Sequence, residues 1–201
     1  MSASNMADRP IIFSAPMVRA LLSGRKTQTR RIIKPQPLQP FCGISTDGVK
    51  WWTNDEEAGV IEPLRVPCAE GDRLWVREAW GMGVSDHGDC PRYKATMDYK
   101  CGDKIKSEHE GPFKWRPSIH MPRWASRITM EVTAVKVERL QDINRGGAME
   151  EGCPFPNMAS GPNPLDWFRD LWTSIHGPGA WEANPWVAAI SFTVERRNID
   201  A

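Results

Sequence analysis

The sequence predicts an α+β fold: a small mixed β-barrel with helices packed on its outside. Three observations lead to it. The best strand patterns alternate apolar and polar residues, short helical patterns separate them, and the 201 residues contain no internal repeat. A chain of this length forms one domain, or one domain with insertions.

The first elements are a short strand and a short helix. Residues 11–14 are mostly apolar, and Ser14 can cap a helix that has Pro16 in its first turn. Gly24 is a natural end for this helix. Residues 1–10 are expected to be a disordered leader, so the predicted domain covers residues 11–201.

Three later segments read as strands. Residues 73–80 follow a Gly-Asp turn. Residues 127–138 alternate between apolar and polar side chains until this alternation shifts near Val135. Residues 186–195 make the last strand. Between them we expect a short helix within residues 140–152 and a strong one after Asn163, which can cap it.

Two stretches have little pattern. Residues 35–70 and 81–114 are rich in Pro, Gly and charged residues, and we expect both to be long loop insertions. A weak strand pattern covers residues 93–97. The ten Trp residues, some of them in these insertions, are expected to be mostly core.

Composition limits the possible partners. The formal net charge is only +1, so any basic site must be local. No window approaches the apolar length of a membrane helix, and the N-terminus has no apolar signal core. We therefore expect a soluble, cytoplasmic protein without a membrane partner.

The five Cys residues are odd in number and widely spaced, which favours reduced thiols over a disulfide framework. Sulfur and imidazole ligands together suit zinc, but no Cys-x-x-Cys pair occurs. We therefore expect no metal and no cofactor. The residues that could otherwise surround a metal are His87, Cys90, Cys101 and His109.

The densest positive charge lies in SGRKTQTRR, residues 23–31. No carboxylate occurs between Asp8 and Asp47 that could pair with it locally. We expect that such a segment cannot bury itself. Its cations would then contact phosphates.

A second basic segment, KWRPSIHMPRWASR, covers residues 114–127. Its arginines have no acid nearby in sequence, and Trp124 is one of the aromatic residues between them. Aromatic faces stack on unpaired bases while Arg and Lys track phosphates. The alternative is a structural loop whose Trp residues plug the barrel end. Either Glu78 faces a cleft or, as we expect, it pairs with Arg77 or Arg73.

Four phrases in order, LLSGRKTQTRR, GDRLWVREAW, RITMEVTAVKVERLQDI and WVAAISFTVER, resemble the ASCH domain, a relative of the PUA-like barrels. The likeness extends over residues 11–196 and is closest to versions encoded by phages and prophages. It implies a PUA-like barrel of about six strands, with a cleft lined by residues 23–31. It also implies RNA, single-stranded DNA or a modified nucleoside as the ligand.

One branch of that family is an amidohydrolase that removes the acyl group of N(4)-acetylcytidine. Its Lys, Thr and Glu fall by motif on Lys26, Thr29 and Glu151, with Glu150 as the neighbouring candidate. A Thr hydroxyl needs a base, and a Lys is a base only when neutral, which burial beside other cations favours. Residues three apart on a strand point to opposite faces, so Lys26 and Thr29 would have to lie on a turn.

Other functions remain open from the sequence. Another ASCH branch is a ribonuclease, a noncatalytic nucleic-acid reader is possible, and a phage structural protein would use the Trp-rich insertions as a protein interface. The sequence leaves catalysis and the oligomeric state undecided. The predicted nucleic-acid contacts are Arg25, Arg30, Arg31, Arg116, Arg123, Trp124 and Arg127.

Overall fold

The computed structural model describes residues 6–36, 41–44, 51–55, 60–85, 88–100, 114–155 and 161–201. The chain divides into two compact units, each described by itself. Unit 1 holds residues 1–24, 72–131 and 193–201, and unit 2 holds residues 25–71 and 132–192. The single domain over residues 11–201 stays a prediction.

Unit 1 is built on three paired strands. Strand β1 (Asp8–Ile12) runs parallel to β6 (Arg73–Arg77), and β6 pairs antiparallel with the first residues of β10 (Thr129–Arg139). β1 thus begins within the segment predicted as a leader. Helix α1 (Ala15–Leu22) follows, with Ser14 at the predicted N-cap position, although the Ser14 side chain makes no capping hydrogen bond.

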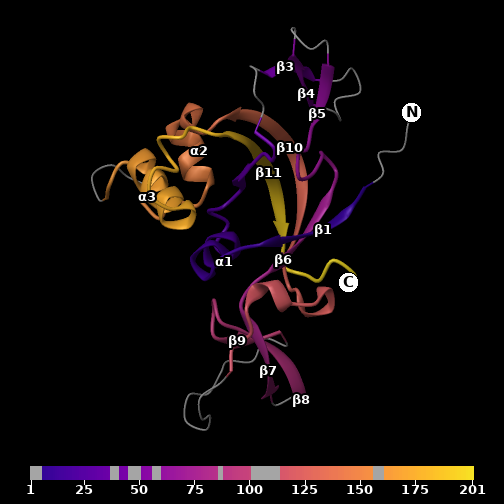
Figure 1. Ribbon diagram of the computed structural model, residues 1–201. Helices are drawn as coiled ribbons and strands as arrows, with labels where there is room; N and C mark the ends of the chain where they lie inside the picture. The colour runs from indigo at the N-terminus through magenta and orange to yellow at the C-terminus, as the bar shows by residue number, and fades with distance from the viewer. Residues whose placement is uncertain are drawn as a thin grey trace. The chain divides into compact units, whose positions relative to one another are not determined.

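A small second sheet of unit 1 occupies a predicted insertion. β7 (Trp80–Ser85), β8 (Gly88–Tyr93) and β9 (Asp98–Tyr99) pair antiparallel (Figure 1). The prediction of a long loop is therefore wrong over these residues, because backbone pairing overrides their weak strand propensity. The predicted strand at residues 93–97 is also wrong, since residues 94–97 form a turn.

Two 3-10 turns of unit 1 follow the undescribed residues 101–113. They are η1 (Ser118–His120) and η2 (Arg123–Ala125). Their packing partners come from the small sheet. A buried cluster is formed by Trp80, Tyr93, Met121 and Ala125.

Unit 2 pairs β2 (Gln28–Ile32) antiparallel with β11 (Trp186–Glu195), which covers the predicted last strand. β3 (Phe41–Ile44), β4 (Trp51–Asp55) and β5 (Val60–Leu64) form a separate antiparallel sheet. This sheet replaces part of the other predicted loop insertion.

The helices of unit 2 follow β10. The helix predicted within residues 140–152 divides into the 3-10 turn η3 (Leu140–Asp142) and α2 (Arg145–Glu150). α3 (Pro164–His176) begins after Asn163, whose side chain accepts a hydrogen bond from the Leu165 amide, as predicted. Figure 1 shows α2 beside α3. Their shared core contains Leu140, Ile143, Ala148, Phe168, Trp172 and Val187.

Five of the strands form one sheet, in the order β1-β6-β10-β11-β2. The mixed α+β class is confirmed. In the part of the chain that the structure describes, β1 and β2 are end strands, so backbone pairing does not close the predicted barrel. No helix among the described residues is long and apolar enough to span a membrane.

Candidate functional site

Lys26 lies at the centre of the candidate site in unit 2. Its side chain is fully buried, and its Nζ donates to Glu151 Oε2 at 2.6 Å. Nζ also donates to the carbonyl oxygens of Glu151 at 3.0 Å and Gln28 at 2.9 Å. Three acceptors match the three donors of an ammonium group. The structure therefore brings together two predicted residues that lie 125 positions apart.

The backbone explains how Glu151, rather than Glu150, reaches Lys26. Glu151 is the C-cap of α2, and Gly152 follows with φ +100°, a conformation that glycine adopts without strain. The Thr27 amide donates to the Glu150 carbonyl at 2.9 Å, which fixes the segment before β2 against the end of α2. The Glu150 side chain is exposed.

Arg30 contradicts the expectation that residues 23–31 cannot bury themselves. Its side chain is only 4% exposed and forms ion pairs with Glu138 at 2.9 Å and Glu151 at 3.3 Å. Lys136 pairs with the other oxygen of Glu138 at 2.8 Å. The acids come from β10 and from the end of α2. They are far from Arg30 in sequence, so a local pattern could not predict these pairs.

These contacts form one chain of charges, Lys26, Glu151, Arg30, Glu138 and Lys136 in order. We call it the buried charge chain. Its buried members, two cations and two carboxylates, balance each other, and the third cation, Lys136, is 71% exposed. Removing one partner of a buried pair leaves an uncompensated charge, which is strongly destabilising.

Burial lowers the pKa of Lys26 from its ordinary value, and the charges of Arg31 and Arg30 lower it further. The carboxylate of Glu151 opposes this shift. Burial also lowers the pKa of the Arg31 guanidinium. The direction for Lys26 is the one that a lysine acting as a base requires.

Thr29 does not lie on the predicted turn. The turn is at residues 23–24, and Thr29 lies within β2, buried and opposite Ile190 of β11. Because successive strand residues alternate, Thr29 is on the face of β2 opposite to Gln28 and Arg30. The structure therefore joins Lys26 and Glu151 and places Thr29 on the other face.

An open polar pocket of about 310 Å³ lies beside the buried charge chain. That volume is at the low end of the range of small-molecule sites. Arg30 and Lys136 already pair with Glu138, whereas Asp142 and Glu150 bring two further carboxylates that are exposed. The pocket is lined by Gln28, Arg30, Lys136, Glu138, Asp142, Asn144, Gly146, Gly147, Glu150 and Ala189.

Gly147 makes room for Arg30. A Cβ at this position would lie 2.8 Å from Nη2 of Arg30 and 3.2 Å from the Ile143 side chain. Glycine lowers helix propensity, and no local sequence signal indicates that Gly147 contacts Arg30. Glu138 was missed as well, because it lies beyond the phase slip near Val135, where the buried face of β10 can no longer be read from alternation.

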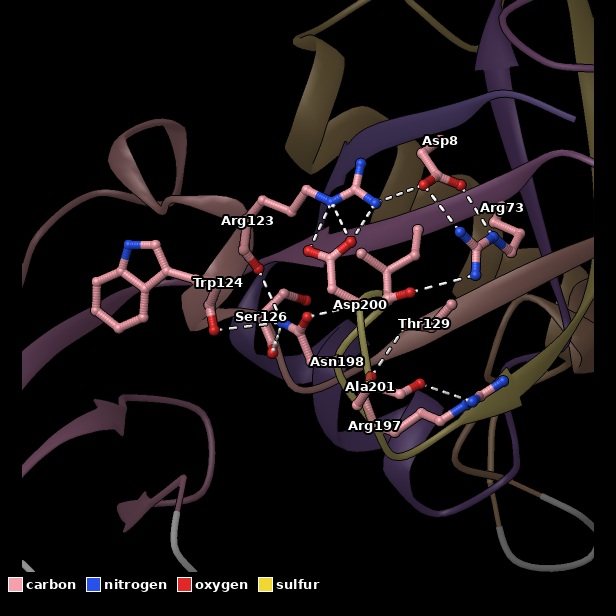
Figure 2. Close-up of polar contacts among 11 residues, drawn as sticks. Asp8, Arg73, Arg123, Trp124, Ser126, Thr129, Arg197, Asn198, Asp200 and Ala201 are labelled. Atoms are coloured by element: carbon pink, nitrogen blue, oxygen red, sulfur yellow. Dashed lines mark hydrogen bonds and ion pairs between the residues drawn. The ribbon is translucent and has the colours of Figure 1, made fainter.

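Two arginines of the second basic segment, in unit 1, are neutralised. Arg123 pairs with Asp200, 2.9 Å from Nε to Oδ2, and also with Asp8 (Figure 2). Arg127 donates to Glu78 at 2.9 and 3.1 Å. Glu78 therefore pairs with Arg127, not with Arg77 or Arg73 as expected. Burial raises the pKa of Glu78, and the bonds from Arg127 oppose that rise.

The other predicted contacts differ in exposure. Trp124 is 53% exposed, and Arg116 is exposed with its guanidinium carbon 5.3 Å from the Trp80 ring centroid. Arg25 is exposed and donates to the Gly152 carbonyl at 3.3 Å. The two basic segments belong to different units, so each is treated as a separate candidate site.

The residues considered for a metal fall mostly outside the described part of the chain. His87, Cys101 and His109 are not described, and Cys90 is buried. Among the described residues, no cluster of three His, Cys, Asp or Glu residues could hold a metal ion.

Comparisons with known proteins add two solved structures. No family model and no curated protein matches the chain. A protein from Enterococcus faecalis V583, described under the family model DUF984, is 9% identical with a TM-score of 0.42, covering 98% of this chain and 85% of that chain. An ASCH domain from Lactobacillus crispatus JV V101 is 11% identical with a TM-score of 0.42, covering 94% and 79%. The functional proposal therefore rests on the residues and contacts of this chain itself.

Proposed function

We propose that the chain binds an N4-acylated cytosine nucleoside beside the buried charge chain and hydrolyses its acyl-amide bond. The observation that carries the proposal is the 2.6 Å contact between Lys26 and Glu151. The ASCH-like motifs select these two residues independently of the structure. A buried amine and carboxyl in contact can exchange a proton, which supplies a base and an acid in one site.

The pocket favours an uncharged nucleoside over a nucleotide. Its two described cations are already paired with Glu138, while Asp142 and Glu150 add negative charge. A phosphate group would meet these carboxylates and be repelled. Deacylation should therefore be faster for N(4)-acetylcytidine than for its 5′-monophosphate.

The proposed reaction begins when Lys26 gives a proton to Glu151. The resulting amine takes the proton of a water molecule as that oxygen bonds to the acyl carbon, since Thr29 lies on the opposite face of β2. The carbon–nitrogen bond then breaks, and the cytosine amine takes its proton from Glu151.

The test follows cytidine release from N(4)-acetylcytidine by chromatography. We expect release by the wild type and a loss of at least about a hundredfold in Lys26→Met, since general-base catalysis contributes about 10²–10⁴. Lys34→Met is the matched control, because Lys34 is exposed and is not among the residues that line the pocket. It should keep most of the activity.

Two further results bear on the proposal. Thr29→Val should keep the activity if water attacks, whereas a loss in a folded variant would require Thr29 to reach Lys26 from the opposite face of β2. Melting curves of each variant separate loss of catalysis from loss of folding. A folded wild type that releases no cytidine would contradict the proposal.

A further inference from the structure

Trp124 is an exposed aromatic residue on a rigid turn of unit 1. It lies in η2, and its ring centroid is 5.8 Å from that of Trp80, with the two ring planes perpendicular. In Figure 2 its indole points away from the cluster of Arg123, Asp200 and Asp8. Exposing so large an apolar ring is unfavourable in water, so a ligand that covers it would gain free energy.

The C-terminal residues hold this turn in place. Asn198 Nδ2 donates to the carbonyl oxygens of Arg123 at 2.9 Å, Trp124 at 3.3 Å and Ser126 at 2.7 Å (Figure 2). Ile199, next in the chain, is buried. Because these bonds already order the turn, stacking a ligand on Trp124 does not cost the free energy of ordering it.

The charges near Trp124 are not those expected from sequence. The Arg123 side chain is directed to Asp200 and Asp8, and Arg127 is occupied by Glu78 and Asp98. The single charge of Arg127 is thereby shared between these two acids.

Two other cations lie close to Trp124. Arg116 stacks over Trp80, the ring against which Trp124 packs. Lys100 Nζ donates to the Trp124 carbonyl oxygen. An anionic ligand that covers the indole would therefore meet positive charge at its border.

We propose that Trp124 is a stacking platform for an unpaired base of a single-stranded nucleic acid, with Arg116 and Lys100 attracting the backbone phosphates. A π-face accepts any base, so binding is tolerant of sequence. The flanking cations favour a polyanion over an uncharged apolar partner. This site is separate from the proposed deacylase site in unit 2 and does not depend on it.

The first experiment measures fluorescence anisotropy of a labelled deoxythymidylate dodecamer at low salt. Loss of one stacked base should weaken binding about tenfold in Trp124→Ala, whereas Trp124→Phe keeps a ring and should stay within about threefold of the wild type. Ile119→Ala is the matched control, because Ile119 is an apolar residue of the same region and is 56% exposed. Its affinity should be unchanged.

The dependence of oligonucleotide binding on salt concentration distinguishes the role of Arg116 from that of Arg123. Each phosphate contact of a single strand contributes about 0.7 to the slope of log affinity against log salt. Arg116→Gln should reduce the magnitude of this slope by about that amount. Arg123→Gln should leave the slope unchanged, because Arg123 is held by Asp200 and Asp8.

Three results would overturn the proposal. They are no binding of the dodecamer by the wild type, equal losses in Trp124→Ala and Ile119→Ala, and self-association in sedimentation that requires Trp124, which would make a second copy the occupant. Deacylation of the free nucleoside should be the same in Trp124→Ala and the wild type, so failure here and failure of the proposed activity are distinguishable.

Discussion

The two basic segments of this chain look alike in sequence and differ in the structure. In residues 23–31, Lys26 and Arg30 are buried and paired with carboxylates from distant parts of the chain. In residues 114–127, Arg123 meets its acids near the surface, with its side chain 37% exposed, and Trp124 remains uncovered. A local excess of positive charge therefore does not show whether a segment is a surface patch. The partners and their burial decide that.

The largest effect should come from breaking the buried charge chain. Glu151→Gln removes the carboxylate shared by Lys26 and Arg30, and should lower the free energy of unfolding by about 3–5 kcal/mol. Denaturant titration measures it. Asp200→Asn, which breaks the exposed pairing of Arg123, should have a much smaller effect. Equal losses would remove the distinction between the two segments.

Gly147→Ala should sharpen the comparison by pushing chiefly on Arg30, with Ile143 as the next close neighbour. The new methyl group would overlap Nη2 of Arg30, and overpacking of this kind costs about 1–3 kcal/mol. Gly146→Ala is the matched control, since its Cβ would have a single neighbour, Asn144 Oδ1 at 3.3 Å. A smaller loss at Gly147 than at Gly146, in thermal unfolding, would mean that Arg30 is free to move.

The pH dependence of stability tests the burial of Lys26. Its pKa is lowered in the folded state, so between that value and 10.5 the unfolded chain binds more protons. The free energy of unfolding should then rise with pH in this window, by at most about 1.4 kcal/mol per pH unit. Lys26→Met should lack this contribution. Parallel curves for the two proteins up to pH 10.5 would contradict the lowered pKa.

Asn198→Ala should lower the free energy of unfolding by about 1–3 kcal/mol, because it removes two short neutral hydrogen bonds that each contribute about 0.5–1.5 kcal/mol. The specific readout is Trp124. Loosening its turn should weaken oligonucleotide binding without changing the salt slope. Unchanged binding would show that the C-terminal residues do not position the platform.

Local signals predicted the elements that depend on neighbours in sequence. Ser14 with Pro16 defined α1, Asn163 with Pro164 defined α3, and alternation defined β11. The small sheets were missed because strands such as β7 and β8 contain Gly and Pro residues, and pairing rather than propensity forms them. A barrel was expected from the strand and helix patterns as well as from the resemblance, and the described strands do not close one.

The candidate site could be predicted only in part. The motifs selected Lys26 and Glu151 because a family pattern links them across 125 residues. The burial of Arg30, its pairing with Glu138 and the space left by Gly147 depend on contacts between β2, β10 and α2. No local pattern carries such information, since each residue alone is an ordinary Arg, Glu or Gly.

The most direct test of the central claim, that the Lys26/Glu151 pair performs deacylation, is the rate of cytidine release between about pH 6 and pH 10, corrected for spontaneous hydrolysis. In the proposed reaction the Lys26/Glu151 pair keeps one proton, which Lys26 passes to Glu151 and Glu151 gives to the leaving amine, and burial lowers the pKa of Lys26. The rate should therefore stay level at lower pH and fall as the pH rises past that lowered pKa, below 10.5. A rate that keeps rising up to pH 10 would contradict the assignment of the pair as base and acid.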